Sequence, residues 1–479
     1  MRLGKVRCLH FVGVGGSGMS GLAEIVASLG FNVTGSDVRR SSVTDRLSSL
    51  GVAVTIGHAI ENVGSADTVV FTSAARPDNV ELVEARARRI PVIARAELLA
   101  ELMRLRFGIA IAGAHGKTTT TSMIALVLEH AGLDPTAVIG GRLSAFGSNS
   151  RLGRSEYMVA EADESDRSFL LLWPSIAVIT NVDREHMEAY SSFAELQQTF
   201  VEFANKVPFY GAVVACVDDP ELNTILPRLT RRVITYGLTR NDAEIGAQDV
   251  VLEGFGSVST VLRRTRDRQA PASEVLGELR MRVPGRHSVQ NALAAVAVGL
   301  ELDVPFDKIA SALGEFAGAE RRFEHRGEVN GITVIDDYGH HPTELATVLA
   351  AAKAAHPKRV LVAFQPHRYT RTRDLMREFG LALAQADEVV LTDIYAASEE
   401  PIPGVTVEAL AAAMNTARSV PVRVVKGVEH VAAALAALAV PGDLLITMGA
   451  GSIGTVAAQV IDELRHRFGV EEPTGKDVH

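Results

Sequence analysis

The stretch GIAIAGAHGKTTTTSMIALVLEH, residues 108–130, places a lysine and four threonines between an apolar strand-like run and an apolar helix-like run. In such a loop, Lys117 can reach β- and γ-phosphates and the Thr118 hydroxyl can ligate magnesium. The spacing departs from the general phosphate-loop pattern, because Gly113 stands only three positions before Gly116. Its place between strand and helix still favours a triphosphate site over a chance match. The predicted nucleotide contacts are Gly113, Ala114, His115, Gly116, Lys117, Thr118 and Thr119.

A magnesium–triphosphate site also needs carboxylates, and the string EADESD supplies four of them directly after an apolar strand. Glu161 is predicted at the carboxyl end of that strand, where ligands bind in open α/β sheets. An exposed acidic turn is the alternative interpretation. A second string, TNVDREHMEAY, also follows a strand and contains His186. A lone histidine is usually structural, so the residue pattern alone does not single it out. The four carboxylates are Glu161, Asp163, Glu164 and Asp166.

Two further glycine loops match the pattern G-x-G-x-x-G, and each follows a predicted strand. The first, Gly13–Gly18, opens a helix, and Asp37 ends the next strand. This arrangement suits a pyrophosphate at a helix N-terminus. For the first loop, phosphate binding and simple packing both remain open. For the second loop, Gly449–Gly454, a tight turn between strand and helix is the favoured interpretation.

Two strings near the C-terminus, DDYGHHPTE (336–344) and QPHRYTRTRD (365–374), each follow a predicted strand. Arginine presents a bidentate fork to carboxylates, so arginines with neighbouring histidines suit a carboxylate substrate. A solvated charged loop is the alternative. The basic residues gather at strand ends in an otherwise acidic protein, which favours a ligand site. The residues concerned are Asp337, Tyr338, His340, His341, Arg368 and Arg371.

The elements that must position these side chains alternate between strand-length apolar runs and helical patterns, which predicts α/β architecture with parallel sheets. We expect three domains: a Rossmann-like domain at 1–106, a central P-loop ATPase-type domain at 107–318 and a Rossmann-like C-terminal domain at 319–479. The segment from about 232 to 284, beginning with RRVITYG, has the texture of an antiparallel ribbon and is predicted as such within the central domain.

Composition narrows the possible partners. The 479 residues are 47% hydrophobic and 22% charged, with a net charge of −9. An acidic chain is repelled by nucleic acid and by anionic lipid, so neither is predicted as a partner. Cys8 and Cys216 are predicted to be free thiols. No apolar run reaches 18 residues and the first strand lacks a cleavage site, so we expect no membrane insertion and a cytoplasmic location.

Taken together, the strings resemble a known family. GVGGSGMSG, GAHGKTTTT, EADESD, TNVDREHM, GRHSVQNALAA, RRFEHRG, DDYGHHPTE and PHRYTRT occur in the order seen in the ATP-dependent Mur ligases of peptidoglycan synthesis. The resemblance extends to about residue 465 and is closest to the alanine-adding branch. It implies a ligase that uses ATP and two magnesium ions to activate the lactyl carboxylate of UDP-N-acetylmuramate as an acyl phosphate. The amine of L-alanine would then attack that acyl phosphate.

The resemblance also implies site residues. Catalytic roles would fall to Lys117, Glu161, His186 and Arg322, and magnesium ligands would be Thr118, Glu161 and His186. Further ATP contacts would be Arg322 on the phosphates, Asp337 on the ribose, and His287 and Asn291 near the adenine. The UDP-sugar would contact Gly13, Gly15, Gly16, Ser17, Gly18, Asp37 and Ser73. The amino acid would contact Tyr338, His340, Arg368 and Arg371.

The sequence departs from the family pattern at one position, and three alternative functions can be compared with the one that the resemblance implies. The family commonly has H-N-x-x-N where this chain reads HSVQN, so the role of the position held by Ser288 is open. A murein peptide ligase that adds a recycled tripeptide is the nearest rival, and PHRYTRT favours a single amino acid instead. An NAD-dependent oxidoreductase would explain the first glycine loop but leaves GAHGKTTTT without a role. A UDP-sugar-binding regulator is disfavoured by the intact Lys117, Thr118 and Glu161. Oligomeric state is not predicted.

Overall fold

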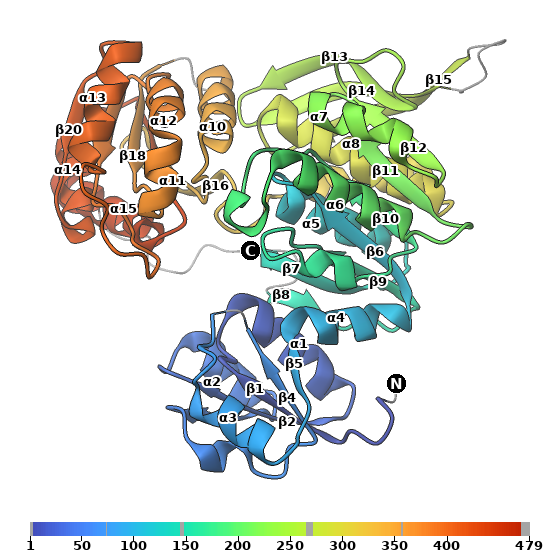
Figure 1. Ribbon diagram of the computed structural model, residues 1–479. Helices are drawn as coiled ribbons and strands as arrows, with labels where there is room; N and C mark the ends of the chain where they lie inside the picture. The colour runs from blue at the N-terminus through green and yellow to red at the C-terminus, as the bar shows by residue number, and fades with distance from the viewer. Residues whose placement is uncertain (1–2, 73, 144–147, 265–271, 356–357, 471–479) are drawn as a thin grey trace. The chain divides into compact units, whose positions relative to one another are not determined.

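The computed structural model describes residues 3–72, 74–143, 148–264, 272–355 and 358–470. Its contacts divide the chain into two compact units, each described here by itself. The first unit comprises 1–249, 259–279 and 290–316, and the second comprises 250–258, 280–289 and 317–479. Three sheets run through the chain, which Figure 1 colours from blue at the N-terminus to red at the C-terminus. The α/β fold class and the Rossmann-like parallel sheets are therefore confirmed.

The N-terminal sheet has five parallel strands in the order β3-β2-β1-β4-β5. This is the doubly wound arrangement, in which ligands bind where the strand order reverses, here between β1 and β4. The strands are β1 Cys8–Val12, β2 Asn32–Asp37, β3 Ala53–Ile56, β4 Thr68–Phe71 and β5 Val92–Ala94. The helices are α1 Ser17–Ser28, α2 Ser42–Ser49, η1 Ile60–Val63, α3 Val80–Ala87 and α4 Arg95–Arg104.

The central sheet has ten strands in the order β15-β14-β13-β12-β11-β10-β6-β9-β7-β8. Its middle strands are parallel and buried on both faces, as their continuous apolar sequences require. The strands are β6 Phe107–Ala112, β7 Thr136–Leu143, β8 Ser148–Arg151, β9 Tyr157–Glu161, β10 Ile176–Ile179, β11 Ala212–Cys216, β12 Val233–Gly237, β13 Ile245–Glu253, β14 Gly256–Arg264 and β15 Ser273–Met281. The helices are α5 Lys117–His130, η2 Ser168–Leu171, η3 Met187–Ala189, α6 Phe193–Asn205, α7 Pro220–Ile225, η4 Leu226–Arg228, α8 Arg286–Glu301 and α9 Phe306–Glu315.

The predicted antiparallel ribbon is correct only in part. Two residues, Gly254 and Phe255, join the neighbouring strands β13 and β14, a connection that only antiparallel strands allow. The prediction for RRVITYG is wrong, because β12 pairs in parallel with β11 and with the start of β13. Helix α7 and η4 lie between β11 and β12 in the chain and supply the crossover that a parallel neighbour needs.

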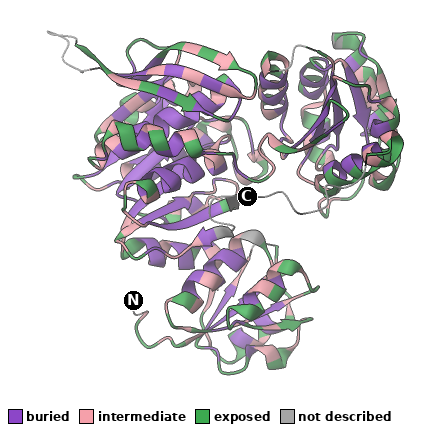
Figure 2. Ribbon diagram, turned by 180° about the vertical axis from the view of Figure 1, so that it is seen from behind, coloured by how far each residue is buried: buried purple, intermediate pink, exposed green. Residues whose placement is uncertain are grey.

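The C-terminal sheet has six strands in the order β16-β17-β21-β18-β19-β20, and only the edge strand β16 is antiparallel to its neighbour. Buried apolar clusters lie on both sheet faces, and Figure 2 shows these strands buried between partly exposed helices. The strands are β16 Glu324–Val329, β17 Ile332–Asp337, β18 Val360–Phe364, β19 Glu388–Leu391, β20 Val422–Val424 and β21 Leu444–Met448. The helices are α10 Pro342–Ala355, α11 Tyr369–Asp374, α12 Met376–Leu383, α13 Val407–Ala417, η5 Val428–His430, α14 Val431–Leu438, η6 Ser452–Thr455 and α15 Val456–Phe468.

Candidate active site

The phosphate loop between β6 and α5 is shaped by two glycines with left-handed backbone angles. Gly113 has φ 134° and Gly116 has φ 80°, a region that favours glycine. A Cβ on Gly113 would lie 2.1 Å from the Thr180 Oγ1, and one on Gly116 would lie 2.9 Å from the Asn291 Oδ1. Both positions therefore exclude a side chain for two reasons, backbone angle and space. The predicted contact Asn291 does lie beside this loop.

Two residues that follow β10 hold the phosphate loop in place. The Asn181 amide accepts the His115 N–H at 2.8 Å and donates to the His115 carbonyl at 2.9 Å. The Thr180 hydroxyl donates to the same carbonyl at 2.6 Å. The His115 ring nitrogen Nε2 lies 2.9 Å from an Asp183 oxygen. Sequence reasoning missed this support, although its signal was present in the polar string TNVD at a strand's carboxyl end.

Lys117 folds back onto its own loop. Its ammonium donates to the Gly113 carbonyl at 2.6 Å, to the Ala114 carbonyl at 3.2 Å and to the Glu164 Oε1 at 2.8 Å. Burial alone would lower the pKa of Lys117, but the carboxylates of Glu164, Asp163 and Glu161 outweigh it and raise that pKa. The side chain is therefore a permanent cation beside the loop, as a phosphate site needs.

Thr118 and Glu161 come together as predicted for a magnesium site. The Thr118 hydroxyl lies 3.2 Å from Oε1 and 3.1 Å from Oε2 of Glu161, and the Gly140 N–H donates to Oε2 at 2.7 Å. Thr118 is the second residue of α5, and Glu161 is the last of β9 on the adjacent strand. A hydroxyl and a carboxylate are oxygen donors of the kind that Mg²⁺ prefers, so these residues fit a magnesium ion.

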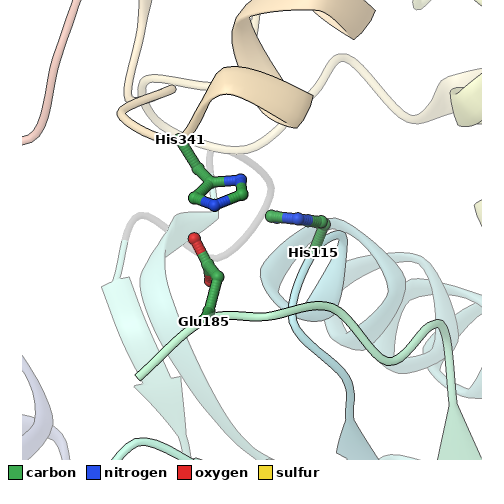
Figure 3. Close-up of side chains that lie close together, drawn as sticks. All are labelled: His115, Glu185 and His341. Carbon is green, nitrogen blue, oxygen red and sulfur yellow. The ribbon is translucent and has the colours of Figure 1, made fainter. Parts of the chain in front are cut away.

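His186 lies in the same unit with two buried carboxylates. Its backbone has φ 55°, which is uncommon for a residue other than glycine. Ligand atoms of Glu164, Glu185 and His186 all lie within 4.8 Å of one another. A ring nitrogen of His115 is likewise within 4.8 Å of a Glu185 oxygen, and Figure 3 shows these two side chains. His341, also labelled there, belongs to the second unit. Glu185 was not predicted as a site residue, and Glu164 was named only as one of the four carboxylates of EADESD.

The segment HSVQN is divided between the units. His287 lies in the second unit and Asn291 in the first, and burial lowers the pKa of His287 to about 4. The departure at Ser288 has a structural account, because its buried hydroxyl donates to the Pro284 carbonyl at 2.7 Å. Gln290 donates to the Asp218 Oδ2 at 2.9 Å. Ser288 thus stabilises the start of α8 within its own unit.

The first glycine loop is built for close backbone approach. Gly13 has φ 79°, and its N–H donates to the Ser36 carbonyl at 2.8 Å. The Asp37 Oδ2 accepts the Gly15 N–H at 2.8 Å, so Asp37 holds the loop from the neighbouring strand. A Cβ on Gly18 would lie 3.0 Å from the Arg95 guanidinium. Gly16 and Ser17 cap and begin α1. The predicted contact Ser73 lies outside the described residues.

In the second unit, Asp337 fixes the backbone at its own strand end and next to Arg322. Its two carboxylate oxygens accept the Phe323 N–H and the Gly339 N–H, both at 2.7 Å. Burial raises the pKa of Asp337 to about 6. The Arg322 Nη1 donates to the Glu344 Oε1 at 3.2 Å. The predicted ATP residues Arg322 and Asp337 therefore lie at one place in this unit.

The predicted amino-acid contacts also gather in the C-terminal unit, along a row of rings. His340 lies 5.3 Å from Tyr338 and 5.7 Å from His367, and His367 stacks on Tyr395 at 5.4 Å between ring centroids. Burial lowers the pKa of His340 to about 3 and that of His367 to about 4, so both rings are neutral near pH 7. His367 and Tyr395 were missed by sequence reasoning.

Two arginines accompany this row. The Arg371 Nη1 is buried and has no hydrogen-bond acceptor among the residues that the structure describes. Arg368 has φ 70° and ψ 139°, a combination that is strained for any residue with a Cβ. Its N–H donates to the Tyr395 carbonyl at 2.8 Å, which helps to hold that conformation. A buried guanidinium with an open donor is suited to a carboxylate.

The second G-x-G-x-x-G loop is filled by protein atoms. The Arg321 guanidinium donates to the Gly449 carbonyl at 2.6 Å, and the Gln365 Oε1 accepts the Ile453 N–H at 3.0 Å. A Cβ on Gly451 would lie 2.5 Å from that same Gln365 oxygen. The loop is therefore a tight, packed turn, which supports the structural interpretation of this glycine pattern.

Comparison with known proteins covers nearly the whole chain. Family models match in order: "Mur ligase family, catalytic domain" at residues 9–107, "Mur ligase middle domain" at 111–299 and "Mur ligase, glutamate ligase domain" at 321–451. A UDP-N-acetylmuramate–L-alanine ligase of Koribacter versatilis is 52% identical over 465 residues, covering 96% of this chain and 98% of the relative. A relative of the same name from Geobacter sp. strain M21 is 51% identical, with the same coverage.

Solved structures agree with this grouping. The crystal structure of a UDP-N-acetylmuramate–alanine ligase from Thermotoga maritima has a TM-score of 0.80 at 28% identity, covering 96% of this chain and 99% of that chain. A murein peptide ligase from Psychrobacter arcticus has a TM-score of 0.68 at 24% identity, covering 95% and 98%. At that identity the second likeness shows the fold alone. Across the described part of the chain, no helix is both long and apolar enough to cross a bilayer.

Proposed function

The chain belongs to the Mur ligase family, and we propose that it uses ATP to join L-alanine to the lactyl carboxylate of UDP-N-acetylmuramate. Relatives that carry this activity in their names, at 51–52% identity over 96% of the chain, support the substrate pair. The observation that carries the proposal in the structure is the phosphate loop, where a permanent Lys117 cation adjoins the Thr118–Glu161 pair. We place the reaction in the cytoplasm, where ATP is available.

The first step is transfer of a phosphoryl group between two anions. The lactyl carboxylate attacks the γ-phosphorus of ATP, the bond to the β–γ bridging oxygen breaks, and ADP leaves an acyl phosphate behind. Lys117 and the N–H groups at the start of α5 meet the charge on the phosphates. Thr118 and Glu161 would hold one magnesium ion, and His186 a second, which would supply further positive charge to these anions.

The second step forms the amide. The amine of L-alanine attacks the carbonyl of the acyl phosphate, and the tetrahedral intermediate expels phosphate and loses a proton. Arg371 and Arg368 bind the alanine carboxylate, while Tyr338 and His340 surround its small methyl group. Neutral rings in that row avoid a competing positive charge near the amine. Positioning of the amine supplies most of the rate enhancement here.

The remaining contacts follow from the same proposal. His287 and Asn291 adjoin the adenine, Asp337 the ribose and Arg322 the phosphates. The UDP-sugar contacts Gly13, Gly15, Gly16, Ser17, Gly18, Asp37 and Ser73, and its pyrophosphate lies at the first glycine loop. Asp37 already supports Gly15 by a hydrogen bond, so its substitution should disturb the loop as well as any sugar contact.

Phosphate release with ATP, UDP-N-acetylmuramate and each of the twenty amino acids tests the proposal. Release is expected only with all three substrates, with L-alanine the preferred amino acid, and it should stop when a chelator removes divalent cations. Preference for the tripeptide L-alanyl-γ-D-glutamyl-diaminopimelate would establish the murein peptide ligase activity instead. Enhanced NADH fluorescence on binding, without phosphate release, would establish a nicotinamide site.

A further inference from the structure

We propose that Glu164 serves two partners: it holds Lys117 at the phosphate loop, and with Glu185 and His186 it binds a divalent cation. The inference rests on the proposed function, because it concerns the same phosphate site. It adds two ligands to His186, the only second-ion ligand predicted from the sequence. It also assigns the chain a link between cation binding and nucleotide binding.

The geometry of the three side chains suits one ion. Their ligand atoms lie within 4.8 Å of one another. Neighbouring oxygens around an octahedral Mg²⁺, each at about 2.1 Å, lie roughly 3 Å apart, so a small closing movement is sufficient. Two carboxylates and one imidazole form a donor set that Mg²⁺ and Mn²⁺ accept. The residues come from the β9 loop and the β10 loop of the same sheet edge.

Glu164 carries an open binding position. Its side chain is only 2% exposed, and its Oε2 has no hydrogen-bond partner among the residues that the structure describes. A buried carboxylate oxygen without a donor is costly, so this atom is available to a cation. Its backbone is held firmly, because the Tyr190 hydroxyl donates to the Glu164 carbonyl at 2.5 Å.

Lys117 and a cation would compete for the other oxygen of Glu164, Oε1. The Lys117 ammonium lies 2.8 Å from Oε1 and also donates to two carbonyls of its own loop, so it points back toward the protein. To serve β- and γ-phosphates, the ammonium must leave at least part of this arrangement. A cation on Glu164 neutralises the carboxylate and weakens its hold on Lys117. Binding of the cation and of the phosphates then favour each other.

The test uses Glu164→Gln in the full chain and two probes, Mn²⁺ alone and metal-free ADP in the presence of a chelator. Free Mn²⁺ is counted by electron paramagnetic resonance, which separates this site from the Thr118–Glu161 site by stoichiometry. We expect Mn²⁺ affinity at one class of site to fall by about tenfold or more. We expect metal-free ADP to bind a few-fold more tightly, because Lys117 loses its buried partner.

The opposite signs of these two effects make the inference falsifiable. Equal weakening of Mn²⁺ and ADP would identify Glu164 as a structural residue only, and unchanged Mn²⁺ affinity would remove it from the cation site. Glu188→Gln, a change at an exposed neighbour of His186, is the matched control and should alter neither. If the Gln variant is unstable, Glu164→Asp, which withdraws the charge by one carbon, should still lower Mn²⁺ affinity. Neither probe requires UDP-N-acetylmuramate or L-alanine, so failure of the proposed function is detected separately.

Discussion

Glu81 and Glu164 are both buried carboxylates in the first unit. Among the described residues, hydrogen-bond donors reach both oxygens of Glu81 but only one oxygen of Glu164. Glu81 lies on α3 with no exposed surface. Its oxygens have five partners: the Ser36 hydroxyl at 2.5 Å, the Asn62 amide at 2.6 Å, the His58 ring at 3.2 Å, the Ala59 N–H at 3.3 Å and the His10 ring at 3.5 Å. Burial alone would raise its pKa, but the hydrogen bonds from His10, Ser36 and Asn62 outweigh this and lower the pKa to about 2.

Glu164 has the opposite balance. One oxygen meets Lys117, and the other meets no donor among the described residues. Burial raises its pKa, and the ammonium of Lys117 opposes that rise. A buried carboxylate whose two oxygens both have hydrogen-bond donors stabilises the fold. A buried carboxylate that has an oxygen without a donor, and that lies among other carboxylates, is available to a ligand. Counting donors around each buried charge therefore separates structural residues from functional ones within a single unit.

The largest expected effect comes from removing the partner of Glu164. Lys117→Met should lower phosphate release by at least about 10³-fold, because the main cation that faces the phosphates is lost. The rate is measured at saturating ATP, and circular dichroism checks the fold. Lys206→Met is the matched control, since Lys206 lies over the Trp173 ring and not at the phosphate loop. Comparable loss in both variants would contradict the role given to Lys117.

The difference between the two carboxylates marks what the sequence could predict. Lys117, Thr118 and Glu161 were found because strand-end motifs fix their place without knowledge of side-chain directions. The pairing of Lys117 with Glu164 joins positions 47 residues apart, and only the packed fold reveals which carboxylate of EADESD turns inward. Nothing in a sequence distinguishes it from its neighbours Asp163 and Asp166.

The wrong prediction for β12 and the missed residue Tyr395 have a related cause. The segment RRVITYG was expected to be antiparallel, yet its strand β12 is a parallel strand between β11 and β13. In the C-terminal unit, Tyr395 was missed because it follows β19 while its stacking partner His367 follows β18. Such contacts between neighbouring loops depend on strand order, which local patterns do not encode.

Glu81 gives the next largest effect, on stability. A folded pKa of about 2, against 4.5 in its ordinary range, corresponds to about 3 kcal/mol of stability that the charge contributes above pH 4.5. Because the folded pKa is depressed, this contribution is lost as the pH falls from about 4.5 toward 2. Hydrogen exchange of β1 and β2 amides, compared between wild type and Glu81→Gln, measures it.

In that experiment the difference between the two proteins should be large at pH 7 and should shrink on acidification. ADP affinity at pH 7 should be the same in both, since Glu81 has no place in the phosphate site. A difference that stays constant from pH 7 to 3 would mean that the Glu81 charge adds no stability, and the comparison with Glu164 would lose its structural half.

Substitution of Asn181 tests whether a neutral side chain contributes to ATP binding by holding the phosphate loop in shape. Asn181→Ala removes one bond to the His115 N–H and one to the His115 carbonyl, so the phosphate loop loosens. Two hydrogen bonds of about 1 kcal/mol each correspond to roughly a ten- to thirtyfold rise in the KM for ATP. Steady-state kinetics measure it, with Asn205→Ala, at a distant loop contact, as the control. An unchanged KM would show that the loop holds its shape without Asn181.

The smallest effect concerns Glu399. Both of its carboxylate oxygens accept hydrogen bonds, yet it supports Arg368, a proposed binding residue. It accepts the Thr370 N–H at 3.0 Å and the Thr370 hydroxyl at 2.6 Å, and it thereby fixes the turn that follows the strained Arg368. Glu399→Gln weakens these bonds, and the KM for L-alanine should rise about two- to fivefold while kcat changes little. Initial rates at varied alanine, with the exposed neighbour Glu400→Gln as control, decide the outcome. A fall in kcat at constant KM would mean that Glu399 acts on the chemistry and not on alanine binding, and donor counting alone would then misassign this residue.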